Sequence, residues 1–227
     1  MQDVEKVYER IWDESIPQEE VRKAMKLLFK EYFKEYSHLW VKIDLTPDEV
    51  EAADLFTIKK CKAKTSESIY QKDGAKMVDR GKTGSYAEFA VQRYLRELLG
   101  MPDFVDTRIG HSKTFDVPDI PALNMGIKAG EWFKVPAVPI IGRNSYPQVI
   151  CIVDKINPAR PSVYICGIAD PDVIDTYQNE SMILDDAFRS RHVKAGFYGF
   201  GHLRPIDSLL SDTHLRMNIK TRVQRKA

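Results

Sequence analysis

Two runs of almost unbroken apolar residues constrain the fold of this chain more than any other feature. They span 149–153 (Val-Ile-Cys-Ile-Val) and 163–168 (Val-Tyr-Ile-Cys-Gly-Ile), and both are rich in β-branched side chains. A strand with one face in water alternates apolar and polar residues, whereas these runs direct apolar side chains to both sides. Both runs are therefore predicted to be strands of a sheet that is covered on both faces.

The first eighty residues are predicted to be mostly helical. Apolar residues recur at helical spacing over 17–36, behind a capping-box sequence that begins at Ser15. Thr46, followed by Pro47-Asp48-Glu49, has the form of a second helix start, and that helix is expected to run to about Lys60. The stretch 62–84 has many lysines and little periodicity, and it is interpreted as a loop or connector.

From Gly84 onward the pattern predicts a helix, three or four strands, a helix and a strand. Ser85-Tyr86-Ala87-Glu88 is interpreted as the first turn of the helix, which Gly100 ends as a C-cap. This order predicts an α/β fold, a mixed sheet with helices packed on it, in two parts: a helical N-terminal lobe (1–80) and a core (81–227) with a basic C-terminal tail. The remaining elements are expected at 104–109, 114–120, 125–129 and 196–200 (strands), about 181–189 (helix) and shortly after 203–207 (helix).

The distribution of charge suggests a polyanion as partner, although the net charge is only +1. Eight lysines and arginines lie between Lys59 and Lys82, against three acids, and the segment 216–226 holds five basic residues and no acid. Basic segments on either side of a core suit a surface that binds a phosphate backbone.

The sequence predicts a cytoplasmic protein without a membrane span. No run approaches the ~18 apolar residues of a transmembrane helix. The N-terminal residues 1–5 are polar and acidic, unlike a secretory signal. The three cysteines, Cys61, Cys151 and Cys166, are widely spaced and are expected to be intracellular thiols.

Four residues in the core have the side chains that phosphodiester hydrolysis needs. Magnesium prefers carboxylate oxygens, and a nearby lysine can orient the attacking water or stabilise the charged transition state. Glu88 lies on the helix before the strands, Asp116 and Asp119 lie on one expected strand, and Lys128 lies on the next. A turn near 121–122 would bring Asp119 and Lys128 together.

The same segments resemble the PD-(D/E)XK nuclease superfamily, whose members share a restriction-endonuclease-like core. The resemblance covers roughly 84–209 and rests on the segments 80–91 (Arg-Gly-Lys-Thr-Gly-Ser-Tyr-Ala-Glu-Phe-Ala-Val), 116–120 (Asp-Val-Pro-Asp-Ile) and 126–128 (Gly-Ile-Lys). It implies an αβββαβ core in which Glu88 is the helix glutamate, Pro118-Asp119 the PD pair and Lys128 the motif lysine.

The chain departs from the family pattern at Gly126, which stands where the second acid is expected, two residues before the lysine. Asp116 and Asp119 can both supply carboxylates if the strand is bulged or bent at Pro118, and we prefer this alternative. Glu131 can replace the acid from the following turn. In a third alternative the site has lost its chemistry and the fold only binds DNA.

The sequence therefore predicts a metal-dependent DNA endonuclease. Glu88, Asp116 and Asp119 are expected to hold Mg²⁺, with Mn²⁺ as a substitute, and no organic cofactor is expected. A homodimer would place two sites across a duplex. The alternative is a catalytically inactive nucleic-acid-binding or scaffold protein on the same fold.

Overall fold

The computed structural model describes most of the chain, and several predictions fall outside the described part. Asp116, the expected helix at 181–189 and the basic tail are among these. The described residues are 17–65, 74–105, 118–131, 138–141, 145–179 and 194–211.

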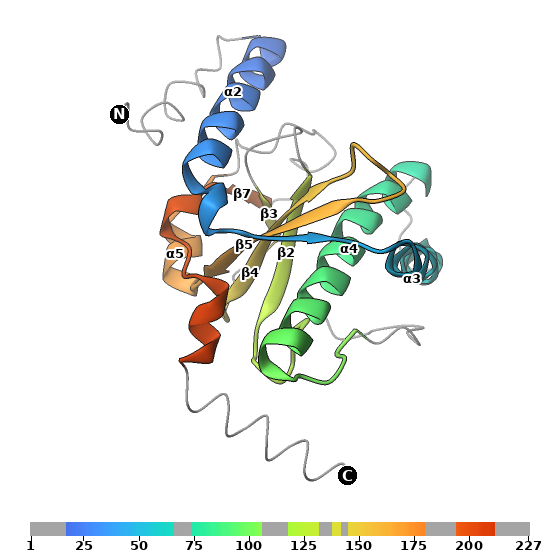
Figure 1. Cartoon of the computed structure of the whole chain (residues 1–227). Helices are drawn as coiled ribbons and strands as arrows, with labels where there is room; N and C mark the ends of the chain where they lie inside the picture. Colours follow the sequence, from blue (N-terminus) through green and yellow to red (C-terminus); the bar gives the residue numbers. More distant parts are fainter. Residues whose placement is uncertain are drawn as a thin grey trace.

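A mixed four-stranded sheet forms the centre of the fold (Figure 1). Its strand order is β1-β5-β4-β2, in which β2 and β4 run parallel and the other neighbours run antiparallel. The strands are β1 (Val41–Asp44), β5 (Ser162–Ala169), β4 (Gln148–Asp154) and β2 (Gly126–Glu131). The two apolar runs are thus confirmed as strands, and the mixed α/β class is confirmed with them.

The sheet is covered on both faces, as the apolar runs predict. Val149, Cys151 and Val153 of β4 join one hydrophobic cluster, whereas Ile150 and Ile152 join another. Since successive side chains of a strand point to opposite faces, each cluster lies on its own side of the sheet.

One long helix covers the first face, and a second long helix packs on it. α4 (Gly74–Leu99) lies along the sheet and contributes Ala87, Ala90 and Val91 to the first cluster, and α3 (Pro47–Thr65) packs on α4 (Figure 1). The expected connector at 62–84 is therefore wrong over its whole described length, because α3 reaches Thr65 and α4 starts at Gly74.

Aromatic side chains and a second sheet cover the other face. Tyr32 of α2 (Gln18–Tyr36) packs on Phe200 with ring centroids 5.6 Å apart, and Trp40 packs on Phe200 at 5.8 Å. The remaining elements on this face are β3 (Val138–Ile141), β6 (Gln178–Asn179) and β7 (Lys194–Phe197) in the order β3-β7-β6, with α5 (Pro171–Thr176), η1 (Ser37–Leu39) and η3 (Phe200–His202). The last element, η4 (Ile206–Leu210), instead contributes Ile206 and Leu209 to the first cluster.

The N-terminal segment contributes directly to the central sheet. β1 pairs with β5, and Leu45 donates its backbone N–H to Pro161 O at 3.0 Å. The capping box at the start of α3 is confirmed, because Thr46 N lies 2.8 Å from Glu49 Oε2 and Glu49 N lies 3.3 Å from Thr46 Oγ1. Within the described residues, no helix combines the length and apolarity that crossing a bilayer requires.

Candidate functional site

A hairpin brings the expected aspartate against the lysine strand. Ile120 and Met125 form an antiparallel bridge, with Ile120 N 2.8 Å from Met125 O. The intervening turn includes Asn124 in the left-handed region (φ 53°), a conformation that asparagine tolerates better than most residues. The turn expected near 121–122 is therefore confirmed. Of the strand expected at 114–120, only 118–120 belong to the described residues, and there Ile120 makes a single bridge to Met125.

Asp119 is held at the open edge of β2. Its Oδ2 accepts a hydrogen bond from Ile127 N at 2.7 Å. Gly126 N donates to Pro147 O on the β4 side at 3.0 Å, so the next N–H along the strand, that of Ile127, points away from β4. The carboxylate thus accepts a hydrogen bond from an N–H of the edge strand that no neighbouring strand uses. Its second oxygen, Oδ1, has no hydrogen-bond partner among the described residues.

Lys128 follows immediately and points to the other face of the sheet from Ile127. It is half-buried and pairs in register with Ile150 of β4, which belongs to the second cluster. No hydrogen bond or ion pair joins its ammonium group to another described residue. The hairpin therefore places the Asp119 carboxylate on Ile127, the residue that precedes a lysine with no ionic partner among the described residues.

The side chain of Gln148 fills the space beside Gly126 that a side chain at position 126 would need. The two residues are paired in register across β2 and β4, and a Cβ on Gly126 would overlap Gln148 Oε1 and lie 2.8 Å from its Cδ. Gln148 is 1 % exposed, and its Nε2 donates to Tyr146 O at 3.2 Å. Its Oε1 is buried and has no hydrogen-bond partner among the described residues. No motif in the sequence points to Gln148; the available signal is a polar residue directly before the apolar run 149–153.

Glu88 lies in the middle of α4, so its expected place in a first helical turn is wrong. Lys60 of α3 binds its Oε1 at 2.7 Å. Ser85, the expected N-cap, lies inside the helix as well, and its hydroxyl is 2.8 Å from Thr57 Oγ1. The helix continues N-terminally past the apparent capping box because α3 packs against that part of α4.

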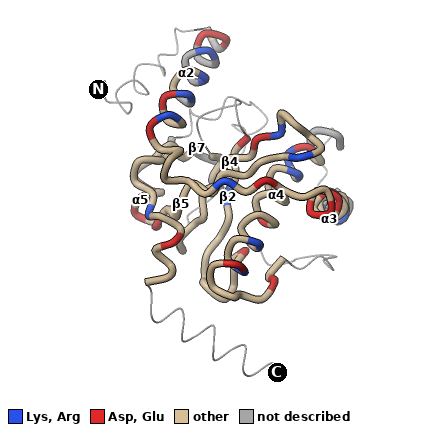
Figure 2. The backbone as a smooth tube through the Cα atoms, viewed as in Figure 1, with Lys and Arg blue, Asp and Glu red and all other residues tan. Residues whose placement is uncertain are grey.

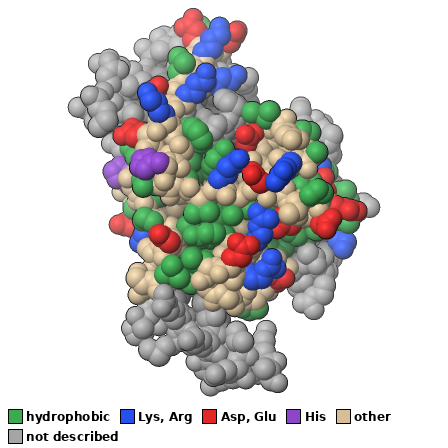
Figure 3. Space-filling view, in the orientation of Figure 1, with side chains coloured by type: hydrophobic (Ala, Val, Ile, Leu, Met, Phe, Trp, Pro, Cys, Tyr) green, Lys and Arg blue, Asp and Glu red, His purple; other side chains and the backbone are tan. Residues whose placement is uncertain are grey.

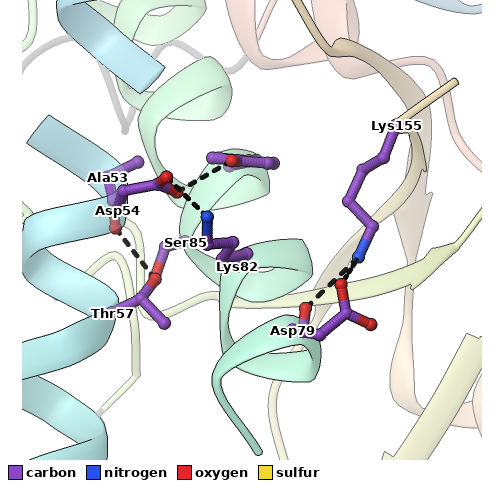
Figure 4. Close-up of polar contacts among 8 residues, drawn as sticks. Ala53, Asp54, Thr57, Asp79, Lys82, Ser85 and Lys155 are labelled. Carbon is purple, nitrogen blue, oxygen red and sulfur yellow. Dashed lines mark hydrogen bonds and ion pairs between the residues drawn. The ribbon is translucent and has the colours of Figure 1, made fainter. Parts of the chain in front are cut away.

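Glu131, the alternative to the missing acid, lies at the far end of β2. Glu131 and Ile127 are four residues apart on β2, so their side chains point to the same face of the sheet. The side chain of Lys128 points to the opposite face. Glu131 Oε2 binds Lys155 Nζ at 3.0 Å, and the same ammonium lies 2.7 Å from Asp79 Oδ1 of α4, as Figure 4 shows for the second contact. In the described structure Glu131 is thus paired with a lysine and joins β2 and β4 to α4, which does not favour this alternative.

Polar contacts between α3 and α4 neutralise lysines of the expected basic segment. Lys82 Nζ binds Asp54 Oδ2 at 2.6 Å, and the Tyr86 hydroxyl donates to Asp54 Oδ1 at 2.8 Å (Figure 4). Burial, together with the bond to Asp54, raises the pKa of Tyr86 well above its ordinary value. With the pair of Lys60 and Glu88, these contacts join two helices, so Lys60 and Lys82 are not free for phosphate.

Charges of both signs are interspersed on the face of the molecule shown in Figure 3. Figure 2 shows the same mixture along the backbone, with lysines following α2.

Among the described residues, which do not include Asp116, no three His, Cys, Asp or Glu side chains lie close enough together to hold a metal ion. No family model, curated protein or solved structure matches the chain.

Proposed function

We propose that this chain is a Mg²⁺-dependent DNA endonuclease with a PD-(D/E)XK-like core. The observation that carries the proposal is the hydrogen bond from Ile127 N to Asp119 Oδ2, which fixes a carboxylate on the residue that precedes Lys128 in β2. This is the juxtaposition that the spacing of the two residues predicts. Asp116, outside the described residues, and Glu88 complete the proposed set of carboxylates.

The donor atoms at this end of β2 suit a hard cation. Asp119 Oδ1 and Gln148 Oε1 are oxygens without partners in the described part of the chain. Mg²⁺ prefers such oxygen ligands and usually keeps several waters besides them. When bound, it would neutralise phosphate charge and lower the pKa of a water. Asp119 would hold the ion, and Glu88 would join only by exchanging its bond to Lys60 for one to the ion.

Lys128 would act on the phosphate and on the attacking water. Its ammonium is not neutralised by any described acid, so its full charge is available to a phosphoryl oxygen. Charged donors aimed at developing negative charge typically contribute a factor of about 10² to 10³ in rate. Lys128 would therefore orient the water or stabilise the transition state, while Asp119 holds the metal.

Exposed lysines of α2 are suited to contacts with the DNA backbone. Lys26, Lys30 and Lys34 are exposed on this helix, and Lys23 makes a surface pair with Glu19 at 3.2 Å. Surface pairs of this kind are weak and easily exchanged for phosphate. A homodimer on this pattern would place two sites across a duplex, which sedimentation with and without DNA would test.

The experiment that tests the function is DNA cleavage by the purified full chain. Linear, circular and branched DNA would be incubated with Mg²⁺ and with EDTA, beside an Asp119→Ala variant. We expect cleavage that needs the metal and is lost in the variant. Cleavage that persists in Asp119→Ala would assign the activity to another site or a contaminant.

A catalytically inactive DNA-binding protein is the second candidate. It is favoured by Gly126, which leaves β2 without the second acid, and by Lys60, which already binds Glu88. DNA binding that weakens steeply with salt, without cleavage in Mg²⁺ or Mn²⁺, would establish this candidate and refute the nuclease.

A further inference from the structure

Gln148 holds a buried oxygen at the place where the nuclease pattern needs one. The residue stands at the start of β4, directly across from Gly126 in the parallel register. Its side chain occupies the volume that any side chain at position 126 would need. Gly126 and Gln148 are thus a complementary pair, in which the glycine makes room for the glutamine amide.

The orientation of the amide follows from its other contact. Nε2 donates to the carbonyl oxygen of Tyr146 at 3.2 Å. The reversed amide would set its oxygen against that carbonyl oxygen, which is repulsive. Oε1 must therefore point toward Gly126 rather than toward Tyr146.

A buried carbonyl oxygen without a donor is costly to the folded state. Leaving such a group unsatisfied destabilises the folded state, and most buried polar atoms have a partner. Among the described residues nothing donates to Gln148 Oε1. A carbonyl oxygen that accepts from no N–H or O–H, yet is fixed by its own amide, is suited to a cation.

We propose that Gln148 replaces the acid missing at Gly126 and is a neutral oxygen ligand of the metal that Asp119 holds. The inference rests on the proposed function and extends it. Asp119 is fixed to Ile127 N, one residue beyond Gly126, so both oxygens belong to the same end of β2. A neutral amide in place of a carboxylate leaves the site one negative charge weaker, and Mn²⁺ is then a suitable probe.

The test measures metal binding without DNA. Binding of Mn²⁺ to the full chain would be followed by electron paramagnetic resonance of the free ion, and the thermal midpoint would be recorded with Mn²⁺ and with EDTA. The variants are Gln148→Met, which keeps the length of the side chain but has no oxygen, Gln148→Glu and Asp119→Ala. We expect Gln148→Met to weaken Mn²⁺ binding about tenfold or more, and Gln148→Glu to retain or tighten it.

Stability in EDTA separates a ligand from a structural residue. Gln148→Met removes the buried oxygen that has no partner, which favours the folded state, and it also removes the hydrogen bond from Nε2 to Tyr146 O, which opposes that gain. Gln148→Met should therefore keep its midpoint in EDTA and lose the increase that Mn²⁺ produces in the wild type. A midpoint that falls in EDTA, with the Mn²⁺ increase intact, would make Gln148 structural and overturn the proposal.

A double variant tests the exchange of positions. Gly126→Asp in a Gln148→Ala background has room for the new carboxylate, and we expect it to recover the Mn²⁺ binding that Gln148→Ala alone loses. If Asp119→Ala abolishes binding while Gln148→Met and Gln148→Ala bind as the wild type does, the ligand role is refuted and the nuclease stands. If the wild type itself binds no Mn²⁺ and cuts no DNA, the proposed function fails and the ligand role fails with it.

Discussion

Gly81 of α4 approaches Thr57 of α3 so closely that a Cβ on the glycine would lie 2.8 Å from Thr57 Cγ2. Thr57 cannot turn away without cost, because it is buried and its hydroxyl lies 2.8 Å from both Ala53 O and Ser85 Oγ. The glycine therefore sets the distance between the two helices.

The first prediction compares two glycines of α4. Gly81→Ala should lower the free energy of unfolding by about 1 kcal/mol or more, because the new methyl group overpacks the interface with α3. Gly84→Ala is the matched control: nothing lies within 4 Å of its Cβ, so the better helix former should raise stability by about 0.5 to 1 kcal/mol. Urea unfolding of both variants checks this, and equal changes would contradict the close approach at Gly81.

The second prediction concerns the pair of Lys60 and Glu88, whose side chains are 32 % and 17 % exposed. In a double-mutant cycle with Lys60→Met and Glu88→Gln, we expect a coupling free energy of about 0.5 to 1 kcal/mol, measured by urea unfolding. If Glu88 also contributes to the proposed site, Glu88→Gln should lower the cleavage rate more than Lys60→Met does. Equal losses of cleavage would leave Glu88 with a structural role only.

The third prediction concerns Asp44, at the end of β1. A hydrogen bond from the Ser162 hydroxyl at 2.6 Å, and then Lys42, lower the pKa of its carboxyl below 3.8. A carboxyl whose pKa is depressed by folding stabilises the protein above its unfolded pKa, and the contribution is lost as the pH falls through the folded pKa.

Ser162→Ala should raise the pKa of Asp44 toward 3.8, as a carbon-detected titration of the side-chain carboxyl would show. Lys42→Met should raise it as well, because Lys42 lowers the same pKa through a second hydrogen bond and through its charge. The stability lost in Ser162→Ala should be largest near neutral pH and should shrink as the pH falls below about 4. A loss that is the same at both pH values would rule out the charge of Asp44 as its source.

Local patterns predicted the parts of the fold that local chemistry decides. The apolar runs that became β4 and β5, the helix at 17–36 and the capping box at Thr46 depend on residues close in sequence. The hairpin of Asp119 and Lys128 was predictable for the same reason, since its turn lies between them.

The remaining features depend on contacts between distant residues. Ser85 and Glu88 look like a capping box, and only the packing of α3 shows that α4 begins at Gly74. Most helical stability in proteins comes from such packing, which single-segment patterns do not contain. The position of Gln148 over Gly126 likewise follows from the parallel register of β2 and β4, which no motif records.

The fourth prediction separates the charge of Asp119 from its hydrogen bond. Asp119→Asn retains an oxygen that can accept from Ile127 N, whereas Asp119→Ala leaves that N–H without its partner. Stability should therefore fall by about 0.5 to 1.5 kcal/mol in the alanine variant and by less in the asparagine variant. Cleavage should be lost in both, because a metal ligand needs the charge. Asparagine activity close to that of the wild type would limit Asp119 to shaping the hairpin.

The last prediction concerns Lys128, whose ammonium makes no hydrogen bond or ion pair with another described residue. Lys128→Met removes the charge but keeps most of the apolar stem, so the free energy of unfolding should change by no more than about 0.5 kcal/mol. Cleavage at saturating Mg²⁺ should fall about a hundredfold, with Mn²⁺ binding unchanged, because the residue acts on phosphate and not on the metal. Arg160→Met, at the exposed turn between β4 and β5, removes one positive charge elsewhere and should cut DNA as the wild type does. Equal losses of cleavage in the two variants would show that Lys128 contributes only to the overall charge of the protein. The ammonium group of Lys128 would then have no role in the proposed site.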